Sequence, residues 1–183
     1  MRGQYADLAF EHRDNISLDE CVAMAEDKTS ALLGSACELG ALAGGARHTR
    51  AGQLRAFGEH LGLAFQLIDD VLGIWGDPQV TGKPVMSDLR TRKKTLPVVA
   101  VLSADTPGSR ELATMYRTRG ALTDVELERA AHLIEQAGGR AWAEAEADRH
   151  VDTALACLAA ADPTKDAGRQ LTALSGFITR RDH

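Results

Sequence analysis

Residues 54–75 read LRAFGEHLGLAFQLIDDVLGIW and contain the pattern that decides the fold. Apolar side chains recur there at steps of three and four residues, the spacing of one face of an α-helix. They are Leu54, Phe57, Leu61, Phe65, Ile68 and Leu72. Further apolar residues cover both flanks of this face. The segment therefore predicts a long helix that is buried over much of its circumference.

One narrow polar stripe remains on this helix. Gln66, Asp69, Asp70 and Gly73 lie three or four residues apart and therefore share one side, which we expect to face a cavity. A buried carboxylate is costly unless it is paired, protonated or bound to a metal, so the two aspartates need a partner. A magnesium ion that carries a diphosphate is one such partner. The alternative is a solvated acidic pair without a function.

The segment that follows carries positive charges. A Gly-Asp-Pro sequence at 76–78 ends the helix. Residues 77–94 contain Lys83, Asp88 and Lys93 in what we predict to be a long loop without regular structure. Because long loops in compact domains are usually functional or disordered, this loop is a candidate part of the site.

Three short sequences, in order along the chain, resemble motifs of the trans-isoprenyl diphosphate synthases (polyprenyl synthetases). The first two are Gly3-Gln4-Tyr5-Ala6-Asp7-Leu8 and Asp27-Lys28-Thr29-Ser30-Ala31. The third is the Asp-Asp pair with the Gly-Asp-Pro, Thr-Gly-Lys-Pro, Ser-Asp-Leu-Arg and Lys-Lys-Thr-Leu-Pro sequences after it. Together they span residues 3–97, and residues 98–183 fit the family only as its variable helical end. The resemblance implies an all-α bundle of the isoprenoid-synthase type.

The resemblance also implies a function, a cofactor and a set of site residues. Members of the family join an allylic diphosphate to isopentenyl diphosphate and release diphosphate, with Mg²⁺ as the cofactor. Asp69 and Asp70 would hold Mg²⁺, which prefers one or two carboxylates together with substrate phosphates. The residues that would bind the diphosphate are Lys28, Thr29, Gln66, Lys83 and Lys93. The catalytic set implied by the family is Lys28, Asp69, Asp70 and Lys83. The lysines, and the Mg²⁺ that the aspartates would hold, supply the positive charge that stabilises the departing diphosphate.

Two departures from the family pattern bear on this interpretation. The family often has a third aspartate where this chain has Gly73, and Asp77 is the nearest substitute. The family's first aspartate-rich motif and its isopentenyl diphosphate residues precede the Gly-Gln segment. We therefore expect this chain alone to be inactive, as a truncated synthase or as a non-catalytic partner subunit of a complete synthase. A terpene cyclase of related fold is a third hypothesis, and the length of the product is not defined by these residues.

Composition and charge agree with one all-helical domain over residues 1–183. Apolar residues make up 44% of the chain and aromatic residues only 4%, which favours closely packed helices over sheets. The net charge of −5 and the lack of a basic run longer than three residues argue against nucleic acid as a partner. No stretch has the ~18 consecutive apolar residues of a membrane-spanning helix, and we expect a cytoplasmic protein. Exposed apolar helix faces predict a homodimer or a heteromer.

The sequence predicts eight helices, with signals for several of their ends. Ser17 with Glu20 and Thr123 with Glu126 form capping-box patterns, and Asp166 opens the last helix. The predicted ranges are 2–12, 17–44, 48–76, 95–104, 108–118, 122–137, 139–161 and 166–180. Three widely spaced cysteines, at positions 21, 37 and 157, are expected to be structural free thiols. The six histidines show no grouping typical of a metal site.

Overall fold

The computed structural model describes residues 2–82, 84–118 and 120–179, and this part of the chain contains helices and no strands. The prediction of an all-α fold is therefore confirmed. The longer helices are α1 (Arg2–Phe10), α2 (Leu18–Ala25), α3 (Ala31–Ala43), α4 (His48–Trp75), α8 (Pro107–Arg117), α9 (Asp124–Gln136), α10 (Gly139–Ala160) and α11 (Lys165–Thr179). The short ones are a π-helical turn η1 (Glu26–Ser30), α5 (Pro78–Thr81), α6 (Ser87–Arg90) and α7 (Leu96–Leu102).

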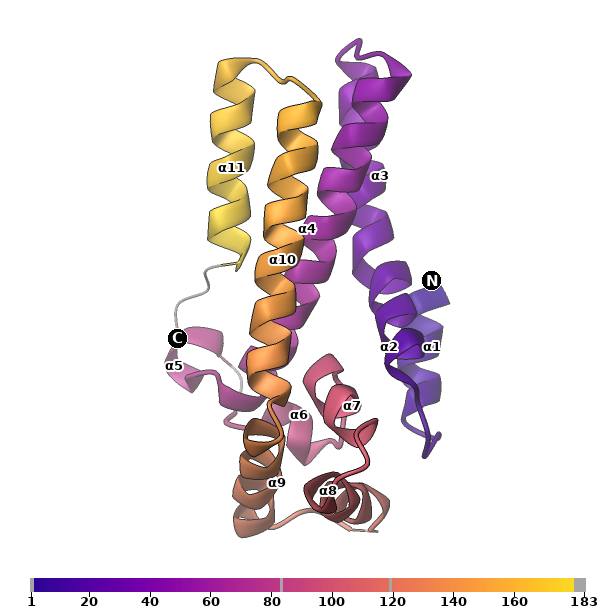
Figure 1. Cartoon of the computed structure of the whole chain (residues 1–183), viewed down its shortest axis with the longest axis vertical. Coiled ribbons are helices and arrows are strands. Elements are labelled where there is room, and N and C mark those ends of the chain that lie inside the picture. The colour runs from indigo at the N-terminus through magenta and orange to yellow at the C-terminus, as the bar shows by residue number, and fades with distance from the viewer. Residues whose placement is uncertain (1, 83, 119, 180–183) are drawn as a thin grey trace.

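Helix α4 lies at the centre of the fold, as its apolar pattern predicts. Figure 1 shows α4 running beside α10, with α3 on one flank and α11 next to α10. Phe57 and Leu61 of α4 pack against Ala154 and Leu158 of α10 in one core cluster. Burial of large apolar side chains such as these supplies most of the driving force for packing the bundle.

A second cluster covers the C-terminal end of α4. There Ile74 packs with Leu89 of α6, Val98 of α7, Leu112 of α8 and Ile134 of α9. Helices α7, α8 and α9 accordingly gather at one end of the molecule, while α3 and α11 extend to the other (Figure 1). This arrangement places the end of α4 that carries the aspartates among several short elements.

The predicted capping boxes are present. The Ser17 and Thr123 hydroxyls accept from the backbone N–H of Glu20 and Glu126, at the starts of α2 and α9. The last helix starts one residue before the predicted Asp166, and the Thr164 hydroxyl accepts there from the N–H of Ala167. Local side-chain bonds of this kind explain why helix starts were readable from sequence.

The segment 77–94 differs from the prediction of a loop without regular structure. It contains α5 and α6, each of four residues. Asp77 caps α5 by accepting from the N–H of Gln79 at 2.8 Å, and Leu89 of α6 is fully buried. Such short helices depend on caps and on one buried side chain, and neither produces a helical periodicity in the sequence.

The three cysteines are free, as predicted. Cys21 is buried, and the pKa of its thiol is raised to about 12. Burial is the main cause, and the negative charges of Asp70 and Asp7 raise the pKa further. None of the helices in the described ranges is long and apolar enough to span a lipid bilayer.

A pair of histidines joins α4 to α10 and predicts a pH dependence of stability. The Nδ1 atoms of His60 and His150 lie 2.9 Å apart, so one ring donates to the other. Burial, then the charges of Arg149 and His60, lowers the pKa of His150 below its ordinary value of 6.5. The unfolded chain therefore binds more protons than the folded chain as pH falls below 6.5, and stability is lost on acidification.

We expect His150→Gln to flatten the pH dependence of the free energy of unfolding between pH 7 and pH 5, measured by urea denaturation. His132 is exposed, and His132→Gln is the matched control. If the free energy of unfolding changes equally with pH in the wild type and in His150→Gln, the His60–His150 contact is not the source of the acid sensitivity.

Candidate functional site

The turn η1 lies where the sequence predicted one uninterrupted helix over residues 17–44. Single π-helical turns within α-helices are frequent at functional sites. Two glycines allow neighbouring helices to approach this turn closely. An ideal Cβ on Gly62 of α4 would lie 2.6 Å from Ser30 Cα, and one on Gly3 of α1 would lie 2.2 Å from Lys28 N. The close approach of α1 and α4 thus surrounds Lys28 and Thr29.

A chain of hydrogen bonds links η1 to the polar stripe of α4. The Thr29 hydroxyl donates to Gln66 Oε1 at 3.1 Å, and Gln66 Nε2 donates to Asp70 Oδ1 at 2.9 Å. Gln66 and Asp70 are buried, with 6% and 2% of their surfaces exposed. The stripe was predicted to face a cavity, but these two side chains are instead packed into the protein and bonded there. Local spacing placed them on one side of the helix, whereas the packing of η1 and α7 decided what covers that side.

Asp70 also holds the start of α7. Its Oδ2 accepts from the backbone N–H of Leu96 at 2.9 Å, one of the N–H groups that a helix leaves without an internal partner. Burial raises the pKa of Asp70 to about 6, against the opposing effects of Lys93, the Leu96 N–H and Gln66. Both carboxylate oxygens of Asp70 are therefore engaged by protein groups.

The structure distinguishes the three consecutive basic residues before α7. Arg92 donates to the carbonyls of Met115 and Gly120, and Lys94 donates to the carbonyl of Phe10 at 2.7 Å. Lys93 instead directs its ammonium towards α4, 3.6 Å from Asp70 Oδ1. Burial disfavours the charge of Lys93, but nearby carboxylates outweigh this, so its pKa lies above the ordinary lysine value. Those carboxylates belong to Asp70, Asp88, Asp7 and Asp69.

Lys28 has a carboxylate partner that the sequence did not single out. Its ammonium lies 2.5 Å from Oδ2 of Asp7 on α1, and both side chains are largely buried. In the sequence Asp7 was equally compatible with an ordinary helix surface, because nothing local connects residues 7 and 28. The pairing follows from the close approach of α1 to η1 at Gly3.

Asp69 is the half-buried member of the Asp-Asp pair. In the described part of the chain, no group of three or more His, Cys, Asp or Glu side chains is arranged to hold a metal ion. Magnesium does not require such a group, since it is commonly bound by one or two carboxylates plus waters and substrate phosphates. A half-buried carboxylate close to Lys93, such as that of Asp69, fits a metal ion that bridges the protein to an anion.

The remaining predicted residues fall outside this group. Lys83 lies outside the described residues. Asp77, considered as a substitute for a third aspartate, is exposed and caps α5. Gly73 is buried against Asp88 of α6. The described candidate residues that the fold does bring together are Lys28, Thr29, Gln66, Asp69, Asp70 and Lys93.

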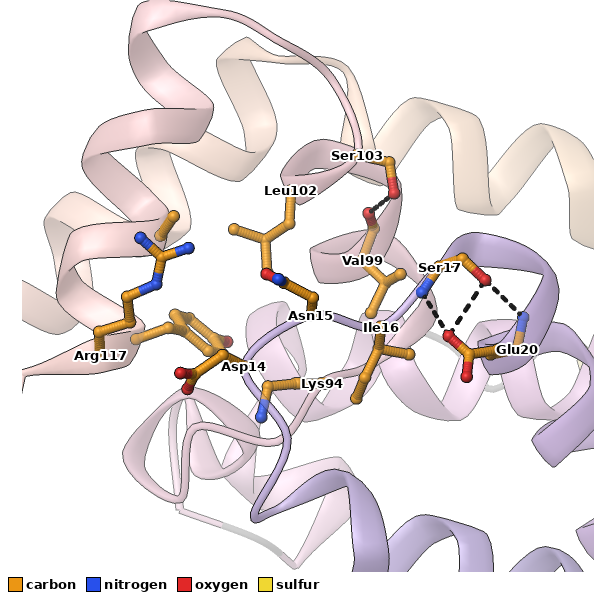
Figure 2. A pocket seen from close by; sticks show the side chains of 12 residues that line it. Asp14, Asn15, Ile16, Ser17, Glu20, Lys94, Val99, Leu102, Ser103 and Arg117 are labelled. Atoms are coloured by element: carbon orange, nitrogen blue, oxygen red, sulfur yellow. Dashed lines mark hydrogen bonds between the residues drawn. The ribbon is translucent and has the colours of Figure 1, made fainter.

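A cavity of about 420 Å³ lies next to this site, between the loop after α1 and helices α7 and α8. Figure 2 shows Ile16, Val99 and Leu102 in its lining, together with charged side chains. The charged residues are Asp14, Glu20, Lys94 and Arg117. Two acids and two bases give this lining no net charge, so it does not select for a diphosphate. The group around Lys28 and Lys93 remains the candidate anion site.

Comparison with known proteins identifies the family of this chain. The family model for polyprenyl synthetases matches residues 1–134. The chain is 48% identical to a (2E,6E)-farnesyl diphosphate synthase of Mycobacterium bovis, a match that covers 99% of this chain and 51% of the relative. It is 44% identical to a geranylgeranyl diphosphate synthase of Mycobacterium tuberculosis, covering 98% of this chain and 50% of that protein.

Solved structures show the same relationship. A polyprenyl synthetase from Streptomyces coelicolor A3(2) superposes with a TM-score of 0.92 at 44% identity, over 97% of this chain and 54% of that one. A geranylgeranyl pyrophosphate synthase from Corynebacterium glutamicum, complexed with isoprenyl diphosphate and magnesium, gives a TM-score of 0.89 at 30% identity. That match covers 98% of this chain and 51% of the other. The chain thus spans about half the length of the relatives it matches, and it belongs to the polyprenyl synthetase family.

Proposed function

We propose that this chain carries the diphosphate-binding part of an isoprenyl diphosphate synthase, a transferase of isoprenoid biosynthesis. The reaction joins an allylic diphosphate to isopentenyl diphosphate and releases diphosphate. The observation that carries the proposal is the convergence of Lys28, Thr29, Asp69 and Lys93 from three separate segments. The relatives named above are farnesyl and geranylgeranyl diphosphate synthases, which favours this reaction over that of a terpene cyclase.

The described residues have distinct roles in this proposal. Lys28 and Lys93 bind the diphosphate and stabilise the negative charge that increases as the carbon–oxygen bond breaks. Lys83 is proposed to do the same from the segment after α5. The hydrogen bond between the Thr29 hydroxyl and the Gln66 amide oxygen fixes the orientation of both side chains at the base of the site. Apolar helix faces around this group exclude water from the reactive allylic cation.

We propose Asp69 as the Mg²⁺ ligand contributed by α4. When bound, Mg²⁺ supplies positive charge that favours departure of the diphosphate. The sequence assigned Asp70 to the metal as well. In the structure its oxygens accept from Gln66 and Leu96, so we propose that Asp70 fixes Lys93 and the start of α7 instead.

Association with another chain is part of the proposal. Large apolar side chains are strongly exposed on α1 and α3, namely Tyr5, Leu8, Leu32 and Leu39. Exposure of several large apolar side chains is typical of a surface that another polypeptide covers. We propose a homodimer or a heteromer in the cytoplasm. A non-catalytic subunit that modifies a complete synthase would also use this surface.

Calorimetric titration with inorganic diphosphate, with and without MgCl₂, tests the proposal. We expect binding to require Mg²⁺, and Asp69→Ala to weaken it by at least the roughly 10–100-fold that loss of an outer-shell metal partner costs. Asp124 is an exposed aspartate on α9, and Asp124→Ala is the control. Magnesium-independent binding, or an unchanged affinity in Asp69→Ala, would show that this group is not the metal site.

A further inference from the structure

Asp88 of α6 occupies the space beside Gly73 of α4. An ideal Cβ on Gly73 would lie 2.2 Å from Asp88 Oδ2 and 2.5 Å from its Cγ. Real Cβ atoms do not approach other atoms so closely, so any side chain at position 73 would displace the Asp88 carboxylate. The lack of a side chain at Gly73 of α4 therefore leaves the space that the Asp88 side chain of α6 fills. The two residues come from separate helices, since α6 begins at Ser87, fourteen positions after Gly73.

The Asp88 carboxylate is buried, and Lys93 is its positively charged neighbour. Only 13% of the Asp88 side chain is exposed, and its Oδ2 has no hydrogen-bond partner among the described residues. The Lys93 ammonium lies 3.7 Å from this oxygen and 3.6 Å from Asp70 Oδ1. A buried carboxylate without a hydrogen bond is costly, so its interaction with Lys93 has to offset that cost.

The backbone after α6 returns the chain so that Lys93 faces Asp88. The N–H of Lys93 donates to the carbonyl of Asp88 at 2.8 Å. Arg92 adopts a left-handed conformation, with φ of 51°, which reverses the chain just before Lys93. Because non-glycine residues seldom adopt such φ values, the surrounding contacts have to maintain this turn. Backbone and side chain of Asp88 thus both hold Lys93.

We propose that Asp88 is a positioning residue, which holds the Lys93 ammonium between itself and Asp70 in the orientation that meets a bound diphosphate. This inference rests on the proposed function and adds a residue to it. Asp88 acts through Lys93, whose ammonium lies 3.7 Å from Asp88 Oδ2. Gly73 is required because a side chain there would displace Asp88.

The test is a double-mutant cycle on Mg²⁺-dependent binding of inorganic diphosphate to the full chain, measured by calorimetry. We expect Lys93→Gln to weaken binding about tenfold, the scale of one charge-assisted contact. Asp88→Asn should weaken it by a similar factor, and the double variant should bind no worse than Lys93→Gln alone. Asp124→Asn is the control. Asp124 of α9 is exposed and pairs with Arg90, which lies on α6 as Asp88 does.

Gly73→Ala is a second test of the position of the Asp88 carboxylate, because the added methyl group displaces Asp88 without changing any charge. We expect it to weaken diphosphate binding, with folding of every variant checked by circular dichroism. Additive losses in the Asp88 and Lys93 variants would overturn the proposal, since Asp88 would then act independently of Lys93. Wild-type affinity in Asp88→Asn, with weakened binding in Lys93→Gln, would overturn it while leaving the proposed function intact. Failure of the wild-type chain to bind Mg²⁺ and diphosphate would overturn both.

Discussion

Asp70→Ala is expected to lower the free energy of unfolding by about 3–5 kcal/mol, the range for removing one partner from a buried charged pair. The Leu96 N–H and the Gln66 amide lose their hydrogen-bond acceptor, and the Lys93 ammonium loses a carboxylate 3.6 Å away. No water is expected to replace the carboxylate fully, because only 2% of Asp70 is exposed. Urea denaturation of the wild-type and variant chains measures the difference.

Two further variants separate this effect from simple loss of a charge. Asp70→Asn keeps one oxygen for the Leu96 N–H but places a donor against Gln66 or Lys93, so we expect a smaller loss of about 1–3 kcal/mol. Asp105 is exposed and pairs with Arg110, and Asp105→Ala should change stability by less than about 1 kcal/mol. A loss below about 1 kcal/mol in Asp70→Ala would mean that Asp70 does not hold α7 and Lys93 in place.

The second large effect is expected from Gly62→Ala, which should destabilise the chain by roughly 3 kcal/mol. The added methyl group would lie 2.6 Å from Cα and 3.1 Å from N of Ser30. These are backbone atoms of the π-helical turn, so η1 as a whole would have to move away from α4. Because Thr29 bonds to Gln66 across the same contact, diphosphate binding should weaken as well.

Gly52→Ala on the same helix is the matched control. A Cβ on Gly52 would meet no atom within 4 Å, and the residue is exposed. Alanine has the higher helix propensity, so this variant should be more stable by about 0.5–1 kcal/mol. Equal effects of the two substitutions would show that helix propensity, and not the close approach of η1, determines the result at position 62.

The sequence was sufficient for the longer helices and for the family. The three- and four-residue periodicity of residues 54–75 predicted α4, and side-chain caps at Ser17 and Thr123 predicted the starts of α2 and α9. Both signals are local, since they depend on residues within one or two turns of each other. The order of three short motifs indicated the polyprenyl synthetase family, which the comparisons confirmed.

Interactions between distant segments were not readable in this way. The pairing of Lys28 with Asp7, the capping of α7 by Asp70 and the contact of Asp88 with Gly73 each join separate elements. The π-helical turn was missed too, because one irregular turn leaves the apolar spacing on both sides nearly unchanged.

By itself, then, the sequence determined where the longer helices lie, which residues share a side of α4, and which family the chain belongs to. Only the tertiary structure decided that Asp70 is enclosed while Asp69 is half-buried, and that Lys93, not Arg92 or Lys94, faces the carboxylates. The physical reason is that helical periodicity fixes directions around one axis. The environment of each side chain depends on how closely other helices approach, and here glycines at positions 3, 62 and 73 set those distances.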